Sequence, residues 1–391
     1  MQHDIAIVGA GIVGLSHAWI AAREGKRVAI FEKSPRSLGA SIRNFGMIWP
    51  IGQPAGEMHE VALASRSLWC EIAKQAGFWL RECGSIHLAH REDEWHVLEE
   101  FAGQAVSFGY DCTLLTEQEV LQKTQAANPE NLRGGLWSPT EMCIDPREVM
   151  RVLPGFLQDQ YGVEIYFSSP VTSVSGSELK IADGRSWRAE EILIASGSDF
   201  ETLFPEVFSS SGLCRCKLQM MRTPPQPAGR EIGPHLASGL TLRHYANFLS
   251  CRSLEQVRQR ISRETPELDR FGVHVMAAQN GRGEVILGDS HEYNGVADPF
   301  CCGKIDELIL RELHKVIRLE DWSIAERWYG EYSKHPSLPY FATSPQPGVT
   351  IVTGLGGAGM TLSFGVAAVG KQTLTVCQPA TAAELPFESP D

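Results

Sequence analysis

The stretch IAIVGAGIVG at residues 5–14 decides the fold of this chain. Its first four residues are apolar and mostly β-branched, which is typical of a buried parallel strand. Gly9, Gly11 and Gly14 follow in a G-x-G-x-x-G pattern. In this pattern the first glycine permits a tight turn, the second lets a pyrophosphate approach the backbone, and the third lets a helix pack closely on the strand. The stretch therefore predicts the phosphate-binding turn of a dinucleotide site.

The residues after this turn complete a β-α-β unit. Residues 15–24 have helical composition, Gly25 ends the helix, and residues 27–31 form a second apolar strand. The backbone amides of Ile12 and Val13 lie at the helix N-terminus, where the partial positive charge favours phosphate. An α/β domain with a parallel sheet is therefore expected at the start of the chain.

An acidic residue stands at the end of the second strand. Glu32, followed by Lys33, lies 18 residues after Gly14, where a carboxylate accepts hydrogen bonds from the hydroxyl groups of a ribose. A carboxylate at this place disfavours the 2′-phosphate of NADP, so that cofactor is not expected. This unit alone leaves FAD and NAD both open.

A second strand–turn–helix pattern occurs near the end of the chain. Residues 349–353 form an apolar strand, residues 354–360 contain four glycines, and a helical pattern runs from Thr361 to about Cys377. The start of that helix is a second place where backbone amides can meet an anion. In the middle of the chain, residues 190–197 predict another buried strand, which ends in Ala-Ser-Gly.

Length and charge limit the classes of function. The chain has 391 residues, more than the ~250–300 at which single cores stop growing, so two domains are expected. The formal net charge of -12 argues against nucleic acid as the main partner. No run approaches the ~18 apolar residues of a membrane-spanning helix. Neither a nucleic acid nor a membrane is therefore expected as a partner.

The cysteines indicate the compartment. There are ten, and the pairs Cys214–Cys216 and Cys301–Cys302 lack the C-x-x-C spacing of zinc sites. Neither a disulfide scaffold nor a metal site is predicted, and the expected location is the reducing cytoplasm.

The order of these motifs resembles that of the FAD-dependent amine and amino-acid oxidases, the group of D-amino acid oxidase, glycine oxidase and sarcosine oxidase. The resemblance is carried by the N-terminal β-α-β unit, the strand that ends at Gly197, and the glycine turn at 354–360. It implies an FAD-binding Rossmann-like α/β domain of the glutathione reductase type, joined to a mixed, mostly antiparallel α+β substrate domain. It also implies FAD bound without a covalent link, because the family's flavin-linking cysteine has no match here.

The two domains are expected to be discontinuous in sequence. Residues 1–80, 143–205 and 335–391 are assigned to the FAD-binding domain, and residues 81–142 and 206–334 to the substrate domain.

Within these domains, several local patterns predict single elements. Asp145 followed by Pro146 predicts a helix start. Residues 273–278 and 284–287 predict a hairpin, and residues 254–263 and 305–316 predict surface helices.

The resemblance also implies which residues contact the cofactor. Ala358 replaces the histidine that is usual in the C-terminal turn, so no charge is expected from that position. The implied cofactor residues are Gly9, Gly11, Ile12, Val13, Gly14, Glu32, Lys33, Ser41, Asn44, Phe45, Gly46, Val171, Ser196, Gly197, Gly354, Gly356, Gly357, Gly359, Met360 and Thr361.

The chemistry that the resemblance implies is oxidation of a small primary or secondary amine. A hydride leaves the amine α-carbon for flavin N5, water hydrolyses the imine to a carbonyl compound plus amine or ammonia, and O2 is reduced to H2O2. Only the neutral amine can release a hydride, so the pocket must lower the amine pKa or offer a base. The candidate catalytic residues are Met47, Lys217, His244, Tyr245, Tyr332, Lys334 and His335, whereas His291 is expected to be structural.

One departure from the family bears on the substrate. Glycine oxidase-like relatives carry W-x-G-x-R-P before the C-terminal unit, and their arginine pairs with the substrate carboxylate. Here residues 328–333 place Tyr332 at that position. Residues 43–54 and 288–293 are similar to a branch of the family associated with phosphonate catabolism. That resemblance implies 2-aminoethylphosphonate or its N-methyl derivative as substrate, phosphonoacetaldehyde as product, and Lys217, Lys334 and His335 as donors to the phosphonate.

Other functions stay open at this point. A glycine, sarcosine or D-amino acid oxidase is the nearest alternative. A flavin hydroxylase, a flavin-dependent tRNA-modifying domain and a non-catalytic FAD-binding subunit of a heteromeric dehydrogenase are alternatives of other classes. The sequence does not determine the oligomeric state.

Overall fold

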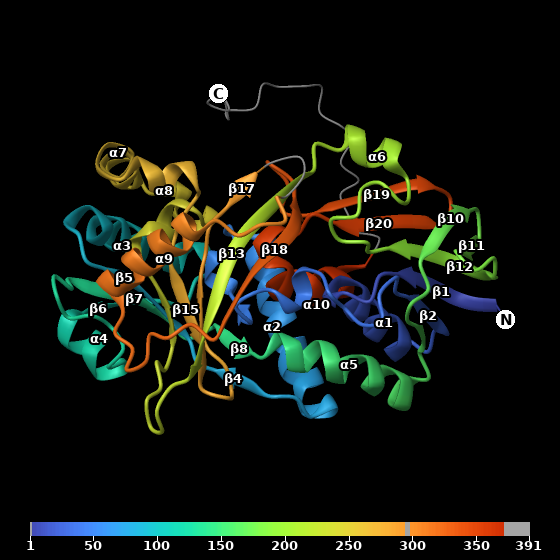
Figure 1. Cartoon of the computed structure of the whole chain (residues 1–391), viewed down its shortest axis with the longest axis horizontal. Helices are drawn as coiled ribbons and strands as arrows, with labels where there is room; N and C mark the ends of the chain where they lie inside the picture. Colours follow the sequence, from blue (N-terminus) through green and yellow to red (C-terminus); the bar gives the residue numbers. More distant parts are fainter. Residues whose placement is uncertain (1, 294–297, 371–391) are drawn as a thin grey trace.

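The computed structural model describes residues 2–293 and 298–370, and two large sheets organise it. The molecule is elongated (Figure 1), with the first sheet toward one end and the second toward the other. The long strands β13 and β18 lie between the two ends. The chain crosses between the sheets several times, so each sheet is assembled from distant segments.

The first sheet has a parallel centre in the order β9-β2-β1-β12-β20. The antiparallel strand β19 extends it beyond β20, and β11 and β10 run along the first half of β12. Its strands are β1 (Gln2–Val8), β2 (Val28–Phe31), β9 (Glu164–Tyr166), β10 (Val171–Ser175), β11 (Glu178–Ile181), β12 (Ser186–Ile194), β19 (Phe341–Gln346) and β20 (Val349–Thr353). The predicted strands at 5–8, 27–31, 190–194 and 349–353 all belong to this parallel centre.

Helices cover one face of the first sheet. They are α1 (Ile12–Arg23), α2 (Glu57–Ala76), α5 (Pro146–Tyr161) and α10 (Gly359–Val369). Helix α1 packs against α10 and α5, and α10 packs against α2. Phe364 on α10 meets Trp19 and Trp69 edge-on, with ring centroids 5.4 and 4.7 Å apart. All three rings are fully buried, and burial of each large apolar side chain stabilises the fold by ~1.5–3 kcal/mol. Their contact holds α10 in place relative to α1 and α2.

The second sheet is mixed and mostly antiparallel, as predicted. Its main path is β17-β13-β16-β15-β14-β5-β7-β6, with β18 along the other edge of β13, and only the β14–β5 pair is parallel. The strands are β5 (Ser85–Ala89), β6 (Thr113–Thr116), β7 (Gly134–Ser138), β13 (Cys214–Pro225), β14 (His235–Ala237), β15 (Met276–Gln279), β16 (Glu284–Gly288), β17 (Glu292–Tyr293) and β18 (Glu326–Lys334).

Shorter helices lie around the second sheet and in the connections. They are α3 (Glu92–Ala105), α4 (Glu117–Lys123), α6 (Pro205–Ser210), α7 (Leu254–Glu264), α8 (Pro266–Arg270) and α9 (Gly303–Val316). Six single turns complete the set: η1 (Ala40–Ile42), η2 (Pro50–Gly52), η3 (Val106–Phe108), η4 (Gly239–Arg243), η5 (Ala246–Ser250) and η6 (Gly356–Ala358).

A third sheet joins the two halves and was not predicted. It contains β3 (Met47–Ile48), β8 (Met142–Ile144) and β4 (Leu80–Glu82), with β8 in the centre. Strands β4 and β8 cross the expected boundaries at residues 80/81 and 142/143, whereas the strands of the two large sheets fall within the expected ranges. The domain boundaries themselves stay a prediction.

Most local predictions agree with the structure. Strands β15 and β16 form the expected hairpin, and α5, α7 and α9 lie where helices were predicted. Helix α10 begins earlier than predicted, at Gly359, and ends at Val369, because the C-cap Gly370 has φ +68° and leaves the helical conformation. The predicted helix ran to about Cys377, and its residues from 371 onward lie outside the described residues. Among the residues described, no helix has both the length and the apolar character needed to cross a membrane.

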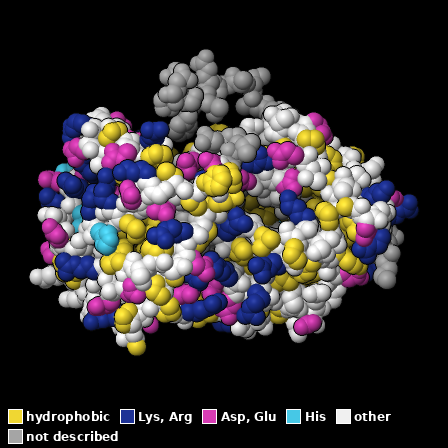
Figure 2. Space-filling view, viewed as in Figure 1, with side chains coloured by type: hydrophobic (Ala, Val, Ile, Leu, Met, Phe, Trp, Pro, Cys, Tyr) yellow, Lys and Arg dark blue, Asp and Glu magenta, His cyan; other side chains and the backbone are white. Residues whose placement is uncertain are grey.

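The surface carries charges of both signs. On the face shown in Figure 2, lysine and arginine side chains are interspersed with aspartate and glutamate side chains. The negative net charge of -12 is therefore not concentrated in one region of this face.

Candidate functional site

A cavity of about 1450 Å³ lies where the two large sheets approach each other. Its wall includes the carboxyl ends of β1, β2, β12 and β20, which is where open α/β sheets bind ligands. The opposite wall is formed by β13, β17, β18 and the turns η4 and η5. The volume exceeds the ~300–1,000 Å³ of usual ligand pockets, so the cavity has room for a large ligand and a small one at the same time.

The first glycine turn opens α1 toward this cavity. Gly9 has φ +106°, and a Cβ on it would lie 2.4 Å from the Ala195 carbonyl oxygen, so glycine is required there for strand packing. A Cβ on Gly14 would lie 2.0 Å from the carbonyl oxygen of Gly9. Gly11 differs, because its added Cβ would meet only the Ser41 hydroxyl, at 3.2 Å. Gly11 thus keeps the approach to the helix start clear.

The loop after β2 supplies polar groups to the same region. The Ser41 hydroxyl accepts a hydrogen bond from the Ile12 amide at 2.9 Å. Asn44 braces its own loop, because its amide donates to the Ala40 carbonyl and its oxygen accepts from the Gly46 amide. A Cβ on Gly46 would lie 2.1 Å from the Ile144 carbonyl oxygen.

Two predicted cofactor residues, Gly14 and Gly46, do not line the cavity. Gly14 serves the close packing of helix on strand that the glycine pattern predicts, and Gly46 serves close backbone packing against Ile144. The other predicted cofactor residues all line the cavity.

Glu32 lies at the far end of the cavity, with 9% of its surface exposed. One carboxylate oxygen accepts from the Ala10 amide at 2.9 Å, and the other accepts from the Ser34 amide at 2.9 Å. Each oxygen keeps a second lone pair, so the carboxylate is fixed in place and can still accept from a ligand. Lys33 pairs with Asp199 at 2.6 Å beside it.

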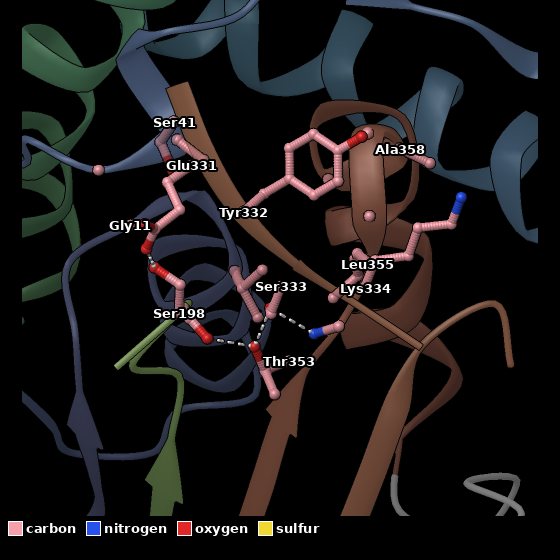
Figure 3. A pocket seen from close by; sticks show the side chains of 18 of the residues that line it. Gly11, Ser41, Ser198, Glu331, Tyr332, Ser333, Lys334, Thr353, Leu355 and Ala358 are labelled. Carbon is pink, nitrogen blue, oxygen red and sulfur yellow. Dashed lines mark hydrogen bonds between the residues drawn. The ribbon is translucent and has the colours of Figure 1, made fainter. Parts of the chain in front are cut away.

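The second glycine turn is held by a chain of hydroxyl groups. The Ser333 hydroxyl lies 2.7 Å from the Thr353 hydroxyl and accepts from the Gly354 amide at 3.0 Å (Figure 3). Thr353 in turn donates to the Gly197 carbonyl at 2.7 Å, which ties β20 to the end of β12. Figure 3 shows Tyr332 on β18 pointing toward the turn that carries Ala358. These hydrogen bonds hold the second glycine turn in place between β18, β20 and the segment that follows β12.

The starts of α1 and α10 have the same electrostatic character. Neither N-cap, Gly11 or Ala358, makes a side-chain capping bond, and neither first turn carries an acidic residue. The Ile12 amide donates to the Ser41 hydroxyl, whereas the next amides of the two first turns have no side-chain acceptor among the described residues. Both helix starts lie on the cavity wall. Two positive helix ends on one cavity suit a ligand with negative or acceptor groups at two places.

The chain matches a known protein family over most of its length. A family model described as "DAO: FAD dependent oxidoreductase" matches residues 4–370. The chain belongs to this family of FAD-dependent oxidoreductases. Its cofactor is FAD, and the cavity fits it, with clearance at Gly11 for a pyrophosphate and a fixed carboxylate at Glu32 for a ribose.

Relatives and solved structures agree with this family. The chain is 28% identical to glycine oxidase of Geobacillus kaustophilus over 50% of this chain and 55% of that protein. It is 26% identical to a subunit of the opine oxidase of Agrobacterium tumefaciens over 56% of this chain and 63% of that protein. The matches thus span about half to two-thirds of these curated relatives.

Two solved structures show the same fold. The crystal structure of glycine oxidase from Geobacillus kaustophilus superposes with a TM-score of 0.74 at 19% identity, covering 94% of this chain and 93% of that one. L-proline dehydrogenase from P. horikoshii gives 0.75 at 19% identity, covering 96% of both chains. At this identity the likeness concerns the fold alone.

One predicted catalytic residue, Lys217, does not line the cavity. Successive side chains of β13 alternate, and Leu218 and Met220 line the cavity. Lys217 therefore faces the other side of the sheet, where its ammonium group donates to the Phe300 carbonyl at 2.6 Å. The prediction for Lys217 was wrong because residue type does not reveal which face of a strand a side chain occupies.

The other predicted catalytic residues all line the cavity: Met47, His244, Tyr245, Tyr332, Lys334 and His335. Lys334 donates to the Tyr293 hydroxyl at 3.1 Å. His335 holds a turn, since its Nδ1 accepts from the amides of Ser337 and Leu338 at 3.1 and 3.0 Å. Partial burial lowers the pKa of His335, which agrees with a neutral ring in that role.

Aromatic side chains build the apolar part of the cavity. The ring of Tyr245 is stacked near Trp49, with centroids 6.0 Å apart, and its hydroxyl donates to the Met276 sulfur at 3.2 Å. Burial raises the pKa of Tyr245 and of Tyr332. Both phenols therefore stay protonated at neutral pH, and Tyr332 is a hydrogen-bond donor beside the second glycine turn.

A histidine cluster on the same wall was not predicted. His244, His274 and His291 line the cavity with ring centroids 4.1 to 5.6 Å apart, and the rings of His274 and His291 are stacked. The buried carboxyl group of Asp289 lies 3.2 Å from Nε2 of His274. Burial raises the pKa of Asp289 and lowers that of His291 to about 4. His291, expected to be structural, belongs to the cavity wall.

Proposed function

We propose that the protein is an FAD-dependent oxidase of a small primary or secondary amine. The observation that carries the proposal is a single cavity that runs from two helix starts, whose N-cap residues make no side-chain bond, to a pocket of aromatic, methionine and histidine side chains. Relatives named as glycine oxidase, as a subunit of opine oxidase and as D-amino acid dehydrogenase support a substrate with a C–N bond.

We assign the parts of FAD to the two ends of the cavity. The start of α1, with Gly11 and the Ser41 hydroxyl, would hold the pyrophosphate, and Glu32 would accept the ribose hydroxyl groups. The turn from Gly354 to Thr361 and the start of α10 would face the flavin. Bound FAD supplies the acceptor for a hydride from the amine α-carbon.

The surrounding side chains prepare the amine for this reaction. Trp49, Met47 and Tyr245 give the pocket an apolar wall, and an apolar site lowers the pKa of a bound ammonium group. The amine then binds in its neutral form. The Tyr332 hydroxyl can donate a hydrogen bond to a polar group of the substrate. Water converts the imine product to a carbonyl compound, and O2 is the proposed final acceptor, giving H2O2.

We propose an aminophosphonate, either 2-aminoethylphosphonate or its N-methyl derivative, as the substrate. Tyr332 offers a single donor where a carboxylate would require a guanidinium fork. Lys334 and Arg43 line the cavity, and separate point donors of this kind suit a tetrahedral dianion. Lys217 faces away and Nδ1 of His335 is engaged, so the phosphonate would be met by Lys334, Tyr332 and Arg43 instead.

Two alternatives lead to different experimental results. Glycine, sarcosine or a D-amino acid would be the substrate if a carboxylate is recognised in another way. A role as one component of a heteromeric enzyme is favoured by the match to opine oxidase, because the matching relative is named as one of its subunits. We place the protein in the reducing cytoplasm, which the nine described cysteines, all free, support.

The test is an amine panel with peroxide detection on the purified, FAD-loaded chain. It should include both aminophosphonates, glycine, sarcosine and a D-amino acid. In Lys334→Ala, loss of a charge-assisted hydrogen bond of ~1.5–3 kcal/mol should raise KM for the aminophosphonates by about 10- to 150-fold and leave uncharged amines little changed. Lys217→Ala is the matched control, because that lysine lies on β13 but faces away from the cavity.

Each alternative has its own signature in this panel. If glycine or sarcosine exceeds both aminophosphonates in kcat/KM, the aminophosphonate proposal is wrong. If no amine reduces the bound flavin of the isolated chain, the role as a component of a heteromeric enzyme replaces the oxidase.

A further inference from the structure

We propose that His244, His274 and His291 form a binding site for a divalent transition-metal cation of the zinc type on the cavity wall. The proposal goes beyond amine oxidation and does not depend on it. The three residues come from the end of η4 and from two segments next to the β15–β16 hairpin, and they are separated by 30 and 17 positions in the chain.

The ring nitrogens are already close together. One nitrogen from each histidine lies within 4.8 Å of the other two. Zinc binds imidazole nitrogen at ~2.0–2.1 Å, so tetrahedral ligands lie roughly 3.3 Å apart. The His244 side chain is exposed to the cavity, so a change of its side-chain rotamer could close the difference. Three imidazoles are also a ligand set that zinc uses in proteins.

The outer contacts leave ring nitrogens available. Nδ1 of His291 lies 3.4 Å from the Gly272 carbonyl oxygen, which fixes that nitrogen as the donor and leaves Nε2 with its lone pair. Nε2 of His274 lies 3.2 Å from Oδ1 of Asp289. A carbonyl or carboxylate behind each metal-binding histidine is the usual arrangement in metal sites.

Two buried atoms at this place lack partners. His274 is 4% exposed and Asp289 5%, yet Nδ1 of His274 and Oδ1 of Asp289 have no hydrogen-bond partner among the described residues. The 3.2 Å contact between the two side chains is thus close without being aligned as a hydrogen bond. Buried polar atoms without a partner are uncommon in proteins. A cation bound by Nδ1 of His274 would give that atom a ligand and place positive charge near the carboxylate.

The charges near the cluster permit a cation. Arg243 and Lys334 are the positive groups that act on these histidines. Arg243 is paired with Asp269, and the Lys334 ammonium group donates to Tyr293. Asp289 lies directly behind the imidazoles, and a bound cation would favour the ionised form of its buried carboxyl group. Three protein ligands would leave a coordination position that faces the cavity, as in sites that bind water or a substrate group.

The experiment measures zinc per chain in tag-free, FAD-loaded protein. The protein is stripped with a chelator, equilibrated with a small excess of Zn²⁺, desalted, and analysed for zinc and FAD. The wild type should retain one zinc per chain. His274→Gln and His291→Gln should each weaken zinc binding by about tenfold or more. His96→Gln is the matched control, because that imidazole is exposed on α3 and lies outside the cavity.

The outcomes separate cleanly. If the wild type retains no more zinc than His274→Gln, or if His96→Gln lowers zinc as much, the proposed site is wrong. Should His274→Gln fail to fold, as judged by FAD content and Tm, His244→Gln decides in its place because its side chain is open to the cavity. Amine oxidation by metal-free protein would leave this test unaffected, since the readout is zinc content.

Discussion

Replacing Glu32 with alanine separates the role of this carboxylate in folding from its role in FAD binding. The side chain fixes two backbone amides, those of Ala10 and Ser34, each at 2.9 Å. It also lines the cavity at the expected ribose position. The substitution should therefore have two effects. It should destabilise the fold even without FAD, and it should separately weaken the binding of FAD.

The two effects can be sized from the structure. Leaving the buried Ala10 amide without an acceptor costs about 1–3 kcal/mol in the FAD-free protein. Losing a charge-assisted hydrogen bond to FAD costs a further ~1.5–3 kcal/mol, which weakens the Kd by about 10- to 150-fold. Gly11→Val adds a side chain at the pyrophosphate approach and should abolish FAD binding.

The assay is urea unfolding of the FAD-free protein together with FAD titration by flavin fluorescence. Asp4→Ala is the control, because Asp4 also accepts a backbone amide, that of Arg27 at 2.7 Å, in the same β-α-β unit but outside the cavity. It should lower stability and leave the Kd unchanged. A Kd for Glu32→Ala within twofold of the wild type would refute the ribose assignment, and full FAD occupancy in Gly11→Val would refute the pyrophosphate assignment.

Three further predictions concern other parts of the molecule. Ser333→Ala should lower Tm and FAD affinity, with a cost of about 1–3 kcal/mol, because the buried Gly354 amide loses its acceptor; unchanged FAD release on heating would contradict this. Burial lowers the pKa of His87 to about 3, below the unfolded value of 6.5, so the unfolded chain binds the extra proton and stability falls as pH drops below 6.5. In His87→Leu, the free energy of unfolding should therefore fall less steeply with decreasing pH below 6.5, by ~1.4 kcal/mol per pH unit. An unchanged pH dependence would contradict this prediction. Acid precipitation should release all FAD into the supernatant, because no described residue on the cavity wall is a cysteine; colour retained in the pellet would indicate a covalent link.

The fold and the two glycine turns on the cavity wall were predictable because their information is local. Strand, glycine turn and helix follow one another within residues 5–24, and steric limits on the backbone dictate where glycine must stand. The same holds for the turn at 354–361. The third sheet was not predictable, because β3, β4 and β8 are two or three residues long and exist only through pairing with one another.

The substrate half depends on information that a linear pattern does not contain. Whether a side chain of β13 reaches the cavity is set by the pairing of that strand with β18, where Lys217 stands opposite Glu331 and Cys216 opposite Tyr332. A shift of one position would exchange the two faces and bring Lys217 inside. The histidine cluster has the same origin, since its three residues meet only when η4 packs beside the segments that flank β15 and β16. Sequence therefore predicts the two glycine turns, whereas strand register and packing decide which side chains line the rest of the cavity.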